Sequence, residues 1–294
     1  MPERHVYFSL YELRWCAEIL RGNEQQLLEY LACCEGDAAG GGCWPATEHE
    51  LTLSAREISR LLLNEIASAR SLIEHSDGIH SRLFANRGFP DYQAEREARI
   101  DEHPLVCFVR ELRNHILHEA VPAIVFDTSA EAGSAVQNRV CLSKRHLRAS
   151  SKKKWRRGPA KSYLDDAPES IALGALASDY GRHVRDFYGW YRERALQIWK
   201  PEYLSHRLKV KELVLLTLED HVDMWLKDPK PPCRDAFFLR RLIDEEDLLA
   251  LERFTHGSQE RRDATLALLG GHLSMPQRLA DRLHCALAMP DYRL

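Results

Sequence analysis

The segment 108–118 reads F-V-R-E-L-R-N-H-I-L-H and holds the side chains best suited to chemistry, namely Arg113, Asn114 and His118. A histidine with an ordinary pKa of about 6.5 can take up and release protons at neutral pH. A guanidinium can bind phosphate oxygens in a bidentate manner and stabilise the negative charge that develops on them. A neighbouring amide can orient either the histidine or the phosphate. This group is therefore suited to proton transfer at a phosphodiester without a metal or any other cofactor.

RNA offers a substrate for such a group, because its own 2′-hydroxyl can attack the adjacent phosphorus. In that reaction we expect His118 to act as the general acid and base, and Arg113 to stabilise the transition state. Asn114 would be the orienting group. The products would be a 2′,3′-cyclic phosphate and a 5′-hydroxyl.

The five-residue spacing from arginine to histidine is not selective, because the chain contains it in Arg70/His75, Arg110/His115 and Arg113/His118. The last pair differs in its context, since Asn114 directly follows the arginine. Apolar residues at helical spacing also predict an amphipathic helix that begins at Pro104 and ends before Pro122. On that helix Asn114 and His118 share a face. Arg113 lies about 140° from His118, but its long side chain can reach the same groove.

The pattern Arg113-Asn114-x-x-x-His118, on a late helix of a helical bundle, resembles the R-N-x-x-x-H motif of the HEPN superfamily. The resemblance extends over about residues 1–200, although its specific part is six residues long. It implies a metal-independent endoribonuclease that forms a homodimer, with the two motif helices facing each other across a composite cleft. It also implies a toxin, phage-defence or stress-response role, with an inhibitory or activating protein partner. Some family toxins have a tyrosine two positions after the histidine, where this chain has Ala120.

Two other interpretations of the same helix stay open. In the first, the histidine is a satisfied structural residue and Arg113 forms an ion pair with Glu111 or Glu119, so that the chain is a non-catalytic interaction or regulatory protein. In the second, Glu111, His115 and Glu119 lie on one helix face at i, i+4 and i+8 and bind a transition metal for a hydrolase.

A basic stretch supplies a candidate RNA-binding surface. Residues 139–161 contain ten lysines and arginines and no acidic residue, although the whole chain has a net charge of −3. Positive charge concentrated in this way favours contact with phosphates, and an interleaved tryptophan can stack on a base. The alternative is a solvated loop. The predicted RNA-binding residues are Lys144, Arg145, Lys152, Lys153, Lys154, Trp155, Arg156 and Arg157.

The apolar patterning predicts a mainly α fold. We expect a HEPN-like helical domain over residues 1–200 and a further helical domain over 201–294, with the boundary near Pro201. A small β-hairpin insertion is predicted from Val121–Asp127 and Gln137–Leu142, and a basic insertion of about 137–161 begins with its second strand. Helices are predicted over about 7–26, 27–32, 54–78, 104–120, 170–200, 205–227, 234–254, 258–269 and 276–288, and a loop or broken helix over 86–101.

The composition excludes several classes of protein. Hydrophobic residues make up 45% and charged residues 29% of the 294 residues, which argues against wholesale disorder. No apolar run approaches the roughly 18 residues that a membrane helix needs, and the N-terminus does not have the pattern of a secretory signal. The eight cysteines form no C-x-x-C pair, which favours free thiols in a reducing compartment. We therefore expect a soluble, cytoplasmic protein.

Overall fold

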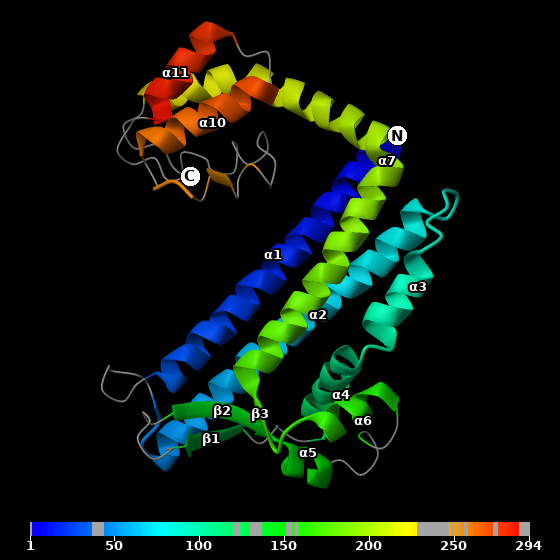
Figure 1. The fold of residues 1–294 in the computed structure, drawn as a ribbon. Coiled ribbons are helices and arrows are strands. Elements are labelled where there is room, and N and C mark those ends of the chain that lie inside the picture. The colour runs from blue at the N-terminus through cyan, green and yellow to red at the C-terminus, as the bar shows by residue number, and fades with distance from the viewer. Residues whose placement is uncertain are drawn as a thin grey trace. The chain divides into compact units, whose positions relative to one another are not determined.

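The computed structural model describes residues 2–36, 44–119, 124–129, 137–150, 155, 158–227, 247, 250–251, 253–255, 258–272 and 276–287. The chain is mainly α with one small antiparallel sheet, as predicted (Figure 1). It divides into two compact units, Met1–Lys200 and Pro201–Leu294.

Three long helices form the body of the first unit (Figure 1). They are α1 (Pro2–Glu35), α2 (Glu48–Leu83) and the part of α7 (Leu173–Lys227) that precedes Pro201. Their apolar residues recur at helical spacing, so that each helix turns one stripe toward the others. Fully buried members of this core are Leu13, Leu20, Leu27, Ile58, Ile66, Leu72, Val184, Phe187 and Tyr191.

Both N-terminal helices are longer than predicted. The structure continues α1 through Gly22 without the predicted break near Leu27, although glycine costs a helix about 1 kcal/mol relative to alanine. In α2 the capping box is formed by Thr47 and Glu50, so the helix begins at Glu48, before the predicted start at residue 54. The Glu50 carboxylate accepts hydrogen bonds from the backbone N–H groups of Ala46 and Thr47, which satisfies donors that the helix itself cannot satisfy.

The segment between α2 and the motif helix is more ordered than the predicted loop. It forms α3 (Tyr92–Arg96) and a π-helical turn, η1 (Glu97–Asp101). Helix α4 (Pro104–His118) follows and confirms the predicted motif helix, with proline in its first turn. π-helical turns are rare and often occur at functional sites. This one directly precedes α4, the helix that carries the candidate catalytic residues.

The predicted hairpin is confirmed by β1 (Ile124–Ser129) and β2 (Gln137–Ser143), while Gly133 lies outside the described residues. A third strand, β3 (Ser170–Ala172), pairs antiparallel with β2. We predicted a helix start there, but α7 begins only at Leu173.

Two short helices that were not predicted lie in the basic insertion or overlap its end. These are α5 (Lys144–Ser150) and α6 (Gly158–Asp166). The Glu35 carboxylate at the end of α1 accepts a hydrogen bond of 2.7 Å from the backbone N–H of Val140, which ties the sheet to α1.

Next to Pro201, α7 contains a kink at which two helices meet, in agreement with the predicted end of one helix and start of the next. The backbone leaves helical geometry at Trp199, with φ −107° and ψ 15°, and the helix then continues to Lys227. The second unit also contains α10 (Gln259–His272) and α11 (Gln277–Leu287), whereas most of the predicted helix 234–254 lies outside the described residues. Within the described ranges, no helix has both the length and the apolar character needed to cross a membrane.

Candidate functional site

Aromatic packing holds α4 in place. The buried Phe108 ring stacks on Tyr163 of α6, with 4.6 Å between the ring centroids, and lies 5.3 Å from the Trp155 ring. Leu105, Val109 and Leu112 are also buried along the same helix. Because these contacts fix the rotation of α4 about its axis, they decide which of its polar residues face solvent.

The three predicted catalytic residues lie on accessible parts of α4. Arg113 and Asn114 are half-buried, and His118 is exposed at the end of the helix. Among the described residues, none of these three side chains has a hydrogen-bond or ion-pair partner. A ligand therefore has no such contact to displace before it can bind them.

The other histidine of this segment has a different environment. His115 is only 1% exposed, and its Nδ1 lies 2.9 Å from Oε2 of Glu119. Its ring also lies near Trp155, with 6.4 Å between the centroids. Glu111 lies beside Arg110, with 4.0 Å between Oε1 and the Arg110 Nε. Among the described residues, Arg113 forms no ion pair with Glu111 or Glu119, so the alternative that pairs them is not found in this structure.

The alternative metal set is not assembled either. No group of three or more histidine, cysteine, aspartate or glutamate side chains comes together as a metal site would require, in the part of the chain that is described. Glu119 contacts His115 as a pair, and Glu111 turns toward Arg110.

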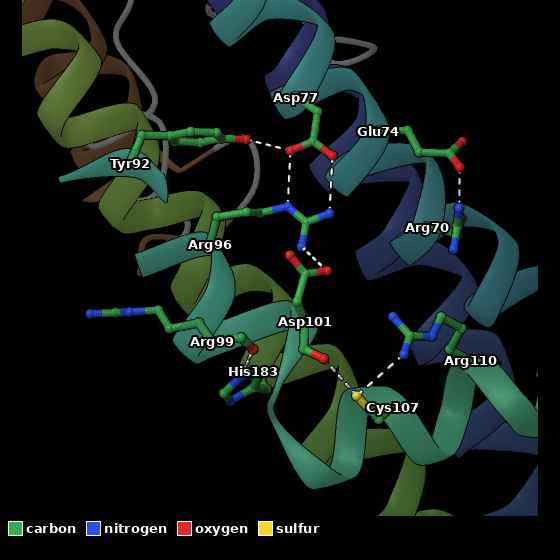
Figure 2. A network of polar contacts seen from close by, with 10 residues as sticks. All are labelled: Arg70, Glu74, Asp77, Tyr92, Arg96, Arg99, Asp101, Cys107, Arg110 and His183. Carbon is green, nitrogen blue, oxygen red and sulfur yellow. Dashed lines mark hydrogen bonds and ion pairs between the residues drawn. The ribbon is translucent and has the colours of Figure 1, made fainter. Parts of the chain in front are cut away.

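A network of polar contacts positions the start of α4 (Figure 2). Arg96 donates two hydrogen bonds to the Asp77 carboxylate of α2, at 2.9 and 3.1 Å, and also forms an ion pair with Asp101 at 2.7 Å. The Tyr92 hydroxyl donates a short hydrogen bond to Asp77. The Cys107 thiol in turn donates to the backbone carbonyl of Asp101, at 2.9 Å. The π-turn is thus fixed to α2 on one side and to α4 on the other.

A histidine pair joins the same turn to α7. His183 Nε2 hydrogen-bonds to the Arg99 carbonyl at 2.6 Å, and its ring stacks on His103 with 3.8 Å between centroids. Burial and the nearby His183 both lower the pKa of His103, so the stack favours its neutral form.

Buried polar groups lie behind the motif helix. Tyr180 of α7 is buried, and burial together with Glu65 raises the pKa of its hydroxyl, while Arg70, Arg113 and Arg110 act to lower it. Glu65 of α2 is fully buried, and neither carboxyl oxygen has a hydrogen-bond partner among the described residues. Burial raises the pKa of Glu65 to about 8, so this carboxyl is mainly protonated at neutral pH. Sequence patterns did not identify Glu65 and Tyr180 as buried polar groups behind the motif helix, because they belong to helices that are distant in the sequence.

The basic stretch does not present all of its predicted residues. Trp155 is only 6% exposed, since its ring packs on Phe108, so it cannot stack on an RNA base in this structure. Lys144 is also buried, and its Nζ donates to the carbonyls of Asp165 and Ala167 at 2.8 and 2.6 Å. Both predicted RNA contacts are therefore corrected to structural roles.

One predicted RNA-binding residue stays available in the described part of the stretch. Arg145 is exposed, and its backbone N–H donates to Glu169 at 2.8 Å. The remaining predicted contacts, Lys152, Lys153, Lys154, Arg156 and Arg157, lie outside the described residues.

Comparison of the chain with known protein families, with curated proteins and with solved structures finds no match. The site must therefore be interpreted from its own geometry.

Proposed function

We propose that this protein is a metal-independent endoribonuclease of the HEPN type. The observation that carries the proposal is the accessibility of Arg113, Asn114 and His118, which lie within six residues on one helix. Among the described residues, none of the three is committed to a hydrogen bond or an ion pair. Their polar groups are therefore available to contact a bound ligand.

The reaction divides between these residues. The 2′-hydroxyl loses its proton to a histidine as its oxygen attacks phosphorus, and the bond to the 5′-oxygen breaks as that oxygen gains a proton. Arg113 would bind the non-bridging oxygens, which become more negative in the transition state. In a homodimer, one copy of His118 can accept the first proton and the other copy can donate the second.

The burial of His115 supports the assignment of proton transfer to His118. Because His115 is buried and paired with Glu119, it cannot exchange protons with a bound RNA. His118 is the histidine of α4 that solvent and a ligand can reach. By analogy with the family, we place the activity in the cytoplasm as a toxin, phage-defence or stress-response effector under the control of a protein partner.

The test is incubation of the purified full chain with mixed cellular RNA in EDTA, beside an Arg113→Ala/His118→Ala variant. His75→Ala is a matched control, since His75 is also an exposed helical histidine that follows an arginine by five residues. We expect the parent and the control to leave 2′,3′-cyclic phosphate ends and the double variant to leave the RNA intact. Equal cleavage by the parent and the double variant would overturn the assignment of the site.

A non-catalytic interaction protein is the alternative function. This alternative predicts an ion pair between Arg113 and a carboxylate. The described residues do not show such an ion pair. If the parent cuts no RNA under any condition tested, this alternative replaces the nuclease.

A further inference from the structure

We propose that α1 carries a self-association surface, on which two copies of this chain pair their N-terminal helices in antiparallel orientation about a twofold axis at Tyr11. The occupant of the surface is therefore a second copy of the chain. The composite cleft of the proposed function lies at α4, whereas this surface lies on α1. The proposal goes beyond the proposed function and does not depend on whether the protein cuts RNA.

The first observation is a row of large apolar side chains on the exposed side of α1. Phe8, Trp15 and Ile19 are 44%, 53% and 56% exposed. The half-buried Tyr11 ring stacks on Tyr7, with 6.5 Å between centroids, and lies 5.8 Å from the Trp15 ring. These contacts join the rings into one continuous row along the helix.

This row is a second apolar face, because a different face of α1 packs into the core. On that other face, Val6, Leu13 and Leu20 are at most 1% exposed. An amphipathic helix needs only one apolar face to join its own core. Contiguous exposed apolar side chains, and aromatic ones above all, mark surfaces that bind another macromolecule.

The second observation is the symmetry of the spacing around Tyr11. Five residues, spaced 3, 4, 4 and 3 positions apart, form what we call the α1 seam, namely Arg4, Tyr7, Tyr11, Trp15 and Glu18. At about 100° of rotation per residue, all five project within about 40° of the direction of Tyr11. The spacing is the same in both directions from Tyr11, so a twofold axis there brings each residue opposite its counterpart.

Charge complementarity selects a second copy as the occupant. In an antiparallel pair, Arg4 of one copy lies opposite Glu18 of the other, at both ends of the seam. Trp15 lies opposite Tyr7, and the two Tyr11 rings meet at the axis. A parallel pair would instead place Arg4 opposite Arg4 and Glu18 opposite Glu18, and like charges repel. The pairing is therefore antiparallel.

Both charged ends of the seam can take part in this pairing. Arg4 is exposed and lies over the Phe8 ring, 5.7 Å from its centroid. Glu18 contacts Arg14 one turn away at 2.9 Å, and its side chain is 44% exposed. An exposed pair of this kind contributes little, and a carboxylate can accept from two donors at once. Glu18 can therefore keep Arg14 and add Arg4 of the other copy.

The same charges disfavour a nucleic acid as the occupant. A single strand could stack its bases on exposed rings, but its phosphates would then lie near the carboxylates of the same face. Glu18 belongs to the seam, and Glu12, with a side chain that is 56% exposed, directly follows Tyr11. Carboxylates repel phosphates, so the surface suits a partner with both signs of charge, as a second α1 is.

The length of the seam sets the expected strength of the dimer. From Arg4 to Glu18 the helix extends over about 21 Å. One helix pair of this length lies at the lower end of specific interfaces, which bury about 1,200 Å² or more. Tyrosine and tryptophan are among the residues that most often dominate binding energy. We therefore expect a dimer that forms and dissociates with protein concentration, not a permanent one.

The test is sedimentation equilibrium of the full chain at increasing protein concentration and low salt. The variants are Trp15→Ala, Arg4→Glu, Glu18→Arg and the double variant Arg4→Glu/Glu18→Arg. Leu53→Ala is the control for loss of an exposed apolar side chain, since Leu53 lies on α2 and is 47% exposed. Arg60→Glu, at an exposed position of α2, is the control for the change in net charge. Circular dichroism checks that every variant stays folded.

We expect Trp15→Ala, Arg4→Glu and Glu18→Arg each to raise the dimer dissociation constant by at least about tenfold. The double variant should return it to within about threefold of the parental value, because the opposite charges face each other again with their signs exchanged. Both controls should associate like the parent.

Three results would overturn the surface. The first is a parent that stays monomeric up to about 1 mM. The second is parental association in Trp15→Ala or in either single charge variant, since a dimer held at α4 would be insensitive to these changes. The third is a double variant that associates no more tightly than the single charge variants, which would exclude the antiparallel pairing of Arg4 with Glu18.

Discussion

His115 and Glu119 form a hydrogen-bonded pair one turn apart at the end of α4, with 2.9 Å between Nδ1 and Oε2. The His115 ring lies near Trp155 and is buried, whereas His118, three residues later, is exposed. Two histidines of one short segment therefore have different roles, one in packing and one available to a ligand.

The first prediction separates these roles. His115→Ala should lower the free energy of unfolding by about 2–3 kcal/mol, because it leaves a cavity beside Trp155 and removes the hydrogen bond between His115 and Glu119. His118→Ala, at an exposed position, should change it by less than about 0.5 kcal/mol. Urea unfolding of both variants measures the difference. An equal loss of stability in the two would contradict the assignment.

The second prediction concerns the pH dependence that Glu65 creates. Its pKa is about 8 in the folded chain and 4.5 in the unfolded chain, so only the unfolded chain is ionised at this residue between those values. Because the folded state holds the extra proton, its stability falls as pH rises from about 4.5 to 8 and then levels off, by at most about 5 kcal/mol.

Glu65→Gln removes this dependence, because an amide does not ionise. The variant should therefore be more stable than the parent at pH 8, with a difference that shrinks toward pH 5. Glu74→Gln, at an exposed position on the same helix, is the control and should leave the pH profile unchanged. Thermal unfolding between pH 5 and 9 measures both, and parallel profiles for the parent and Glu65→Gln would refute the role of burial.

The third prediction tests the network that positions α4. Asp77→Ala removes one carboxylate partner from the largely buried Arg96 and the hydrogen-bond acceptor of Tyr92, and it should cost about 3 kcal/mol. Glu74→Ala breaks only an exposed pair on the same helix, so it should cost less than about 0.5 kcal/mol. Chemical denaturation compares them. Similar costs for the two variants would show that the network does not hold the π-turn.

The fourth prediction uses two glycines of α7. A Cβ at Gly181 would lie 2.7 Å from the carboxyl carbon of Glu24, which is buried and paired with Arg185. Gly181→Ala should therefore destabilise the protein by about 1–3 kcal/mol. Gly189 has no atom within 4 Å of an added Cβ, so Gly189→Ala should stabilise it by about 0.5–1 kcal/mol. The melting temperatures should move in opposite directions, and a shared direction would argue against the packing at Gly181.

The sequence predicted those elements whose signals are local. Helix α4 begins at a proline and carries buried residues at helical spacing, and both signals are visible in the residues themselves. The start of α2 was predicted at residue 54 and not at Glu48, because Thr47/Glu50 and Ser54/Glu57 have the same capping-box spacing. Only the folded structure shows which glutamate reaches the N-cap backbone.

Non-local contacts explain the other differences. Strand β3 exists because Ser170–Ala172 pairs with β2 across the sequence, and three residues carry too little pattern to reveal a strand. The burial of Trp155 and Lys144 depends on α4 and α6, so a basic run alone could not show that they face inward. Likewise, helix packing buries Glu65 completely, and nothing in the spacing of the residues around it predicts this.

The most direct test of the central claim is the rate of metal-free RNA cleavage by His118→Ala relative to His75→Ala. The account predicts that His118→Ala loses at least about a hundredfold in rate in EDTA, as removal of a general acid or base does, while His75→Ala cuts at the parental rate. A His118→Ala variant that cuts as fast as His75→Ala would contradict the account.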